Sequence, residues 1–272
     1  MPRRVLTAIA LAIIGLPAII YGGVFYFVVI TIVLVGSAWE FVRMYRAVQC
    51  EPHEWVTIGG VLLTATARFF FAEAAIPVLV FSIMAAMIVH LLAFERGRDK
   101  AALDFCITLA GIAYIGWLGS YLLDLRALPA GGWWLMLVLP LVWAGDTGAY
   151  SIGAAYGKHK MTPRISPKKS WEGYFAGVFT AVIVGAFFSY AYSTLGPQPL
   201  GEWITPLQGA LFGLVIGVLT PLGDLGESMF KRQSGMKDSS HIFPGHGGFL
   251  DRVDSWLWGA PLGYFLIQFF IF

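Results

Sequence analysis

The chain has 272 residues, of which 58% are hydrophobic, 15% aromatic and only 12% charged. A soluble domain carries about 25% charged residues, so this composition excludes a soluble protein and predicts one that uses the bilayer as its main solvent. The formal net charge of +2 says little by itself, because the positive charge is unevenly distributed along the chain.

Apolar runs near the length of about 20 residues that crosses the hydrocarbon predict an all-α polytopic membrane protein with about nine transmembrane helices. The expected spans are Val5–Ile20, Gly23–Ala38, Trp55–Phe71, Ile76–Phe94, Leu103–Leu123, Trp133–Gly153, Tyr174–Leu195, Leu207–Phe230 and Ser255–Phe272. Tyr21 and Gly22 alone separate the first two, which predicts a tight hairpin. The first run lacks a small-residue cleavage site, so we expect a retained helix and not a signal peptide.

The basic residues indicate how these spans are oriented. With a cytoplasmic N-terminus, the inner side receives every Lys and Arg except Arg68 and Arg126. Because basic loops stay in the cytoplasm, we expect the N-terminus inside and the C-terminus outside. The protein is expected in the cytoplasmic (inner) membrane. Arg43 and Arg46 are interpreted as part of this topology signal.

The two halves of the chain differ in their chemistry. Without a linker or a repeat, the chain is expected to form one integrated membrane domain. Residues 1–130 read as scaffold helices for lipid access or dimer contacts, whereas residues 131–272 carry most of the reactive side chains. Cys50 and Cys106 lack metal-ligand spacing and are not site candidates.

Two polar segments interrupt the apolar pattern of the C-terminal half. Asp146 lies inside the sixth predicted span, where a charged group costs about 2.5 kcal/mol or more and usually faces a cavity, a partner or an ion. The inner loop 157–173 carries side chains that suit phosphate oxygens, among them Ser166, Lys168 and Lys169. A structural hydrogen bond at Asp146 and a basic lipid-facing loop are the alternatives.

Two carboxylate pairs flank a glycine-rich loop near the C-terminus. Asp224 and Glu227 are spaced i, i+3 at the inner end of the eighth predicted span, so they share one helical face. Asp251 and Asp254 repeat this spacing at the start of the ninth, on an adjacent antiparallel helix. Oxygen ligands of this kind suit Mg²⁺, so the pattern predicts a hard-cation site. Interfacial salt bridges are the alternative.

The block from Ser228 to Asp254 resembles the characteristic sequence of the phosphatidate cytidylyltransferases, also called CDP-diacylglycerol synthases. The matching positions are Ser228, Lys231, Arg232, Lys237, Asp238, Pro244, His246, Gly247, Gly248, Asp251, Arg252 and Asp254. Asp146-Thr147 and the segment Ser166–Gly173 also resemble the family, with Ser170 where Thr is more usual. The N-terminal half agrees with it only in length and hydropathy.

This resemblance implies that CTP and phosphatidate react at the cytoplasmic face to give CDP-diacylglycerol and pyrophosphate. It implies Mg²⁺ as the cofactor and allows for K⁺ beside it. It also suggests that the protein forms a homodimer, contacts membrane lipids and has no nucleic-acid partner. As in the family, Asp224 and Asp251 are expected to hold the metal ions. Glu227, Asp238 and Asp254 are expected to bind them too or to lie next to the ligands, with Asp146 completing the polar floor.

The basic and hydroxyl side chains are expected to bind the substrates. The residues expected to hold the CTP triphosphate and the departing pyrophosphate are Lys231, Arg232, Lys237 and Arg252. Lys168 and Lys169 suit a phosphate of either substrate, and Ser166 and Ser228 offer hydroxyls. His246 is expected to shuttle a proton or bind phosphate, and a structural role in its turn is the alternative.

Two other functions stay open on the sequence alone. A CTP-dependent polyprenol or isoprenoid-alcohol kinase would use similar groups but transfer the γ-phosphoryl group. An ion-coupled transporter would need a polar route to both membrane faces, whereas the polar clusters collect at one. A Gly-x4-Gly-Lys-Ser/Thr phosphate loop is absent from the sequence, which excludes an ordinary nucleotide-driven pump.

Overall fold

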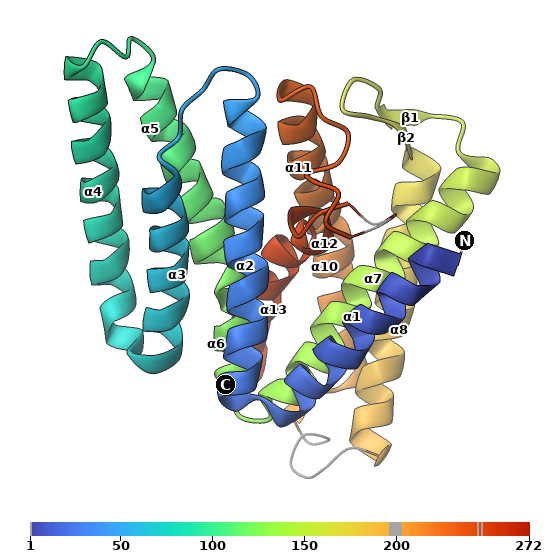
Figure 1. Cartoon of the computed structure of the whole chain (residues 1–272). Coiled ribbons are helices and arrows are strands. Elements are labelled where there is room, and N and C mark those ends of the chain that lie inside the picture. Colours follow the sequence, from blue (N-terminus) through green and yellow to red (C-terminus); the bar gives the residue numbers. More distant parts are fainter. Residues whose placement is uncertain (1, 196–202, 244, 246) are drawn as a thin grey trace. The chain divides into compact units, whose positions relative to one another are not determined.

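A computed structural model gives the structure of the chain and describes residues 2–195, 203–243, 245 and 247–272. Within these residues the fold is helical except for one short β-hairpin (Figure 1). The chain forms two compact units, the first made of Met1–Asp124 and Phe230–Val253 and the second of Leu125–Met229 and Asp254–Phe272. Phe230–Val253 belongs to the same unit as the N-terminal helices. The division expected near residue 130 stays a prediction.

The first unit is a helical bundle. Its elements are α1 (Pro2–Tyr21), α2 (Gly23–Arg46), α3 (Glu54–Phe70), a 3-10 turn (Ala72–Ala74), α4 (Ala75–Glu95), α5 (Ala101–Ala110), a π-helical stretch (Gly111–Trp117), the first part of α6 (Tyr121–Ala127), the end of α11 (Pro221–Gln233) and α12 (Leu250–Val253). Gly22 alone separates α1 from α2 and has a φ of 66°, a conformation that glycine adopts without a steric penalty. The predicted break between the first two helices is confirmed.

Aromatic side chains hold the returning segment in this unit. The ring of Phe230 lies 5.4 Å from that of Phe41 on α2 and 5.7 Å from that of Tyr114 in the π-helical stretch, both edge to face. Edge-to-face pairs at this separation are favourable. Phe230 therefore anchors the end of α11 against the N-terminal helices.

Arg68, one of the two basic residues assigned to the outer side, has a structural partner. Its guanidinium pairs with Asp124 and lies 4.0 Å from the ring centroid of Trp117, and only 7% of the side chain is exposed. A buried arginine with a carboxylate and an aromatic face has its charge compensated locally. This packing accounts for Arg68 without reference to topology.

The second unit consists of closely packed helices and a hairpin. Its elements are the end of α6, α7 (Gly131–Tyr156), β1 (Lys160–Thr162), β2 (Ser166–Ser170), α8 (Trp171–Leu195), α10 (Pro206–Leu219), most of α11 and α13 (Trp256–Phe270). A Cβ at Gly185 would lie 2.1 Å from the carbonyl oxygen of Gly209, so glycine is required for α8 and α10 to approach this closely. Small residues at such contacts are typical of helices packed in membranes.

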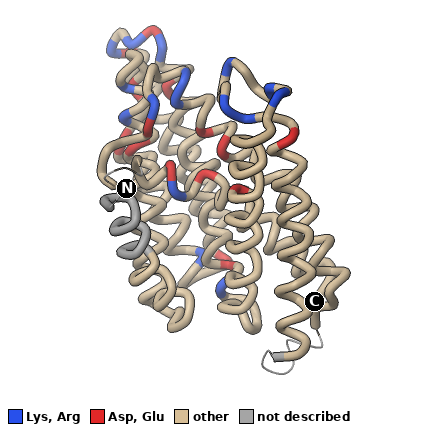
Figure 2. The backbone as a smooth tube through the Cα atoms, turned by 90° about the vertical axis from the view of Figure 1, so that its right-hand side faces the viewer, with Lys and Arg blue, Asp and Glu red and all other residues tan. Residues whose placement is uncertain are grey.

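The hairpin was not expected from the sequence. β1 and β2 pair antiparallel, with Lys160 opposite Ser170 and Thr162 opposite Ser166. It connects α7 to α8 and carries the basic loop, so the Lys and Arg of the second unit, with the exception of Arg126, gather at that end of these two helices (Figure 2). In the first unit, charged residues gather where α2 connects to α3 and α4 to α5.

Six helical stretches within the described residues are long and apolar enough to cross a membrane. They are Gly23–Arg46, Ala72–Glu95, Ala101–Ala127, Gly131–Tyr156, Trp171–Thr194 and Pro206–Gln233. α3 has 17 residues and α13 has 15, which is short of the about 20 residues that a full crossing takes. The helical, polytopic character is confirmed, the count of about nine spans is not, and the orientation of the termini stays a prediction.

Candidate active site

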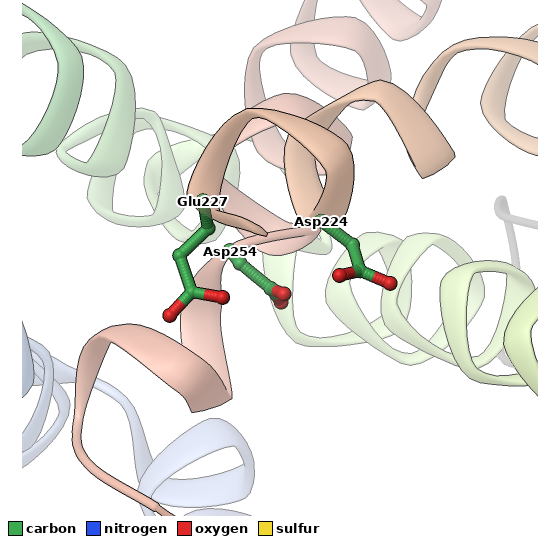
Figure 3. Close-up of side chains that lie close together, drawn as sticks. All are labelled: Asp224, Glu227 and Asp254. Atoms are coloured by element: carbon green, nitrogen blue, oxygen red, sulfur yellow. The ribbon is translucent and has the colours of Figure 1, made fainter. Parts of the chain in front are cut away.

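Three carboxylates of the second unit converge on one point. Asp224 and Glu227 come from α11, and Asp254 follows α12 in the chain. Their carboxyl groups lie side by side (Figure 3), and one oxygen from each lies within 4.8 Å of the others. Glu227 is fully buried and the two aspartates are half-buried. Like charges this close repel, so the arrangement favours a bound cation.

A glycine makes this convergence sterically feasible. A Cβ at Gly223 would lie 2.5 Å from the carbonyl oxygen of Asp254. Because a real Cβ cannot approach that closely, any larger residue would push the backbone at Asp254 away from α11. The i, i+3 spacing then places Asp224 and Glu227 on the same side of the helix, as the sequence predicted.

Basic and hydroxyl groups border the carboxylates. Lys169 on β2 places Nζ 2.7 Å from Asp224 Oδ2, and Ser228 Oγ donates a hydrogen bond of 3.3 Å to Asp224 Oδ1. Asp146 on α7 interacts electrostatically with both Asp224 and Lys169. The structure therefore brings these predicted site residues together with the three carboxylates.

Asp251 has different neighbours, all in the first unit. Its Oδ1 lies 2.7 Å from Lys231 Nζ, and its Oδ2 accepts hydrogen bonds from the amides of Ser239 (2.9 Å) and Gly248 (2.8 Å). Burial raises the pKa of this carboxyl, but the hydrogen bonds from Gly248, Lys231 and Ser239 outweigh it and lower the pKa to about 2. Asp251 is therefore a firmly ionised acceptor.

The expectation that Asp251 and Asp254 share a helical face is wrong. α12 ends at Val253 and α13 begins at Trp256, so Asp254 lies between two helices. The described cluster of carboxylates contains Asp254 and not Asp251. The metal role predicted for Asp251 stays a prediction.

The other predicted residues that the structure describes lie in four places. Lys237, which is exposed, and Asp238, which is half-buried, line a cavity of about 970 Å³ in the first unit, together with Arg43 and Arg46. The remaining residues and their locations are Ser166 and Lys168 on β2, Arg232 at the end of α11 and Arg252 on α12. His246 lies outside the described residues.

The sequence analysis missed one buried acid, Glu40 on α2. It has 0% exposure and accepts hydrogen bonds from Ser239, Ser240, Phe249 and Leu250. A signal was available, because a glutamate inside an apolar helix of 24 residues is costly and usually has a specific partner. The partners themselves come from the block from Ser228 to Asp254, the polar block, which is distant in the sequence.

The chain is similar in sequence to known proteins. A model of the cytidylyltransferase family matches residues 2–270. The chain belongs to the cytidylyltransferase family.

Curated relatives agree with this family, two of them over nearly the whole chain. A protein of Synechocystis sp. is 32% identical over 97% of this chain and 96% of its own length, and one of Bacillus subtilis is 31% identical over 99% and 98%. A third, from Haemophilus influenzae, is 44% identical over 51% of this chain and 46% of its own length. Each of these cytidylyltransferases is named phosphatidate cytidylyltransferase.

Proposed function

We propose that this chain is a phosphatidate cytidylyltransferase, which transfers CMP from CTP to phosphatidate in phospholipid biosynthesis. The observation that carries the proposal is the similarity to relatives of that name over nearly the full length of both chains. The dense carboxylate cluster in a helical protein with several candidate membrane spans is in keeping with a lipid substrate and a charged co-substrate.

The products follow from the balance of bonds. A phosphate oxygen of phosphatidate attacks the α-phosphorus of CTP, and the bond from that phosphorus to the bridging oxygen breaks. Pyrophosphate leaves with the bonding electron pair, and CDP-diacylglycerol remains in the lipid phase. A phosphate monoester has a second pKa of about 6, so the nucleophile is largely ionised at neutral pH and needs no strong base from the protein.

We propose Mg²⁺ as the cofactor, held by Asp224, Glu227 and Asp254. The donor set fits this ion, because all three ligands are carboxylate oxygens and lie within 4.8 Å of one another. When bound, Mg²⁺ neutralises phosphate charge and helps to orient the reacting groups. The K⁺ that the sequence resemblance allows for stays a prediction.

Lys169 contacts this cluster through Asp224. Its Nζ, 2.7 Å from Asp224 Oδ2, is well placed to donate hydrogen bonds to phosphate oxygens that approach the carboxylates. Stabilising charge that develops on transferring phosphates is a major contribution to this type of catalysis. The roles predicted for Lys231, Arg232, Lys237 and Arg252 on the triphosphate stay proposals, as do the cytoplasmic orientation of the site and the homodimer.

The proposal is tested by following the two ends of the triphosphate separately. Detergent-purified protein is incubated with phosphatidate, Mg²⁺ and CTP labelled at either the α- or the γ-phosphorus, and the lipid is extracted. We expect α-label in the lipid and release of pyrophosphate. γ-Label in the lipid, with phosphatidate or with a polyprenol acceptor, would identify a kinase, and no label in either lipid would contradict both enzymatic functions.

A further inference from the structure

Glu40 connects α2 to two separate parts of the polar block. The Ser239 and Ser240 hydroxyls lie 2.9 and 2.6 Å from its carboxylate oxygens, and the Phe249 and Leu250 amides lie 2.9 and 2.8 Å from them. One fully buried carboxylate therefore holds both sides of the chain segment that runs from Ser239 to Leu250.

The fit around this carboxylate is tight. A Cβ at Gly248 would lie 2.1 Å from Glu40 Oε1, so glycine is needed for the backbone to sit against the acid. A buried charge is tolerated where hydrogen bonds satisfy its lone pairs. With donors on both oxygens, Glu40 meets that condition only while both segments stay in place.

The segments that Glu40 holds carry groups predicted to act in the reaction. Ser239 Oγ also lies 2.6 Å from Asp251 Oδ2, so a single hydroxyl separates Glu40 from the carboxylate that binds Lys231. Lys237 and Asp238 directly precede Ser239 and line the cavity of about 970 Å³ that Glu40 itself borders. A shift at Ser239 would move all of these groups.

We propose that Glu40 is a positioning residue for cytidylyl transfer. Its hydrogen bonds fix Ser239–Ser240 and Phe249–Leu250 against α2. These segments in turn fix the positions of Lys237, Asp238 and the Lys231–Asp251 pair. This inference rests on the proposed function. It assigns a role in the reaction to the N-terminal half of the chain, through hydrogen bonds and without contact with the reacting atoms.

The experiment compares Glu40→Gln with a matched control, Asp104→Asn. Asp104 is also fully buried in the first unit and accepts hydrogen bonds from a backbone amide and from Arg98, but it has no bond to the described residues of the polar block. Each variant of the full chain is purified, checked by size-exclusion chromatography and melting temperature, and assayed for kcat and KM with CTP and phosphatidate. Hydrogen exchange is measured in peptides that contain Ser239–Ser240 or Phe249–Leu250.

We expect Glu40→Gln to lower kcat/KM by about 10- to 100-fold, the loss typical of slightly misplaced groups, and to speed exchange in both peptides. Asp104→Asn should lower the melting temperature but leave kcat/KM within about twofold of wild type, because the sites are independent. Should Glu40→Gln fail to fold, Ser240→Ala removes one donor without exposing a buried charge and should lower kcat/KM about 2- to 10-fold.

The activity of wild type and the kcat/KM of Glu40→Gln together separate this inference from the proposed function. Wild-type protein that transfers no CMP would overturn the proposed function and, with it, a positioning role in that reaction. If wild type is active and Glu40→Gln matches it in kcat/KM, the inference fails while the proposed function stands, whether or not exchange increases. An equal loss in Asp104→Asn would also overturn it, because the effect would then reflect general destabilisation.

Discussion

The ammonium of Lys169 lies 2.7 Å from Asp224 Oδ2. Lys169 lies in the basic hairpin strand β2, next to its last residue, and Asp224 lies in the first turn of α11. The sequence presents these as separate motifs, one suited to phosphate and one suited to a metal ion. Their contact makes them parts of one electrostatic arrangement, in which the lysine offsets some of the negative charge of the carboxylates.

Replacing Lys169 by glutamine should therefore affect both catalysis and metal dependence. We expect kcat/KM to fall about 10- to 1,000-fold, because a cation next to the transferring phosphates is lost. The Mg²⁺ concentration that gives the half-maximal rate should fall, because the Asp224 carboxylate is no longer paired with an ammonium that competes with the metal ion. Initial rates of CMP transfer across a Mg²⁺ titration measure both. Lys160→Gln, an exposed lysine on the neighbouring strand β1, is the control and should behave as wild type.

The three clustered carboxylates should be individually essential. Asp224→Asn, Glu227→Gln or Asp254→Asn should each reduce turnover at least about 1,000-fold, because each removes a charged ligand from a site that a metal ion would occupy. Chelation with EDTA should abolish wild-type activity and added Mg²⁺ should restore it. Any of these variants at a near-normal rate, with normal yield in the membrane, would contradict the metal assignment.

Asp251 should contribute to stability in a defined pH range. Its folded-state pKa is lowered from 3.8 to about 2, so the ionised form is favoured in the folded protein. The resulting stabilisation is fully present above pH 4 and is lost as the pH falls toward 2. Melting temperatures from pH 7 to pH 2 should show wild type above Asp251→Asn at neutral pH, with the gap closing below pH 4. A gap that is constant with pH would argue against the ionised pairing with Lys231.

Local patterns in the sequence predicted the parts of the site that depend on one helix. Asp224 and Glu227 meet because their i, i+3 spacing is realised within α11. The same spacing failed for Asp251 and Asp254, because Lys231, Ser239 and Gly248 bind Asp251 while the helix ends at Val253. The periodicity of a helix in the sequence does not predict such competing contacts.

Other features depended on contacts between distant parts of the chain. Glu40 and its four donors are far apart in sequence, so no pattern around either could pair them. The hairpin of β1 and β2 lacks the alternation that marks a strand, as its basic side chains and Pro167 show. The long apolar helices, in contrast, were predictable from composition, although α13 proved shorter than the predicted span.

Gly248→Ala should reveal how firmly the polar block is seated on α2. The added Cβ would lie 2.1 Å from Glu40 Oε1, and Glu40 cannot turn aside without breaking hydrogen bonds. We expect a loss of about 1–3 kcal/mol in stability, as for other overpacked sites, together with reduced kcat/KM. Gly59→Ala on α3, where a Cβ would meet nothing within 4 Å, should be neutral or stabilising by up to about 1 kcal/mol. Thermal melts and CMP transfer measure both variants, and a Gly248→Ala protein that equals wild type would show that the backbone at this position does not rest on Glu40.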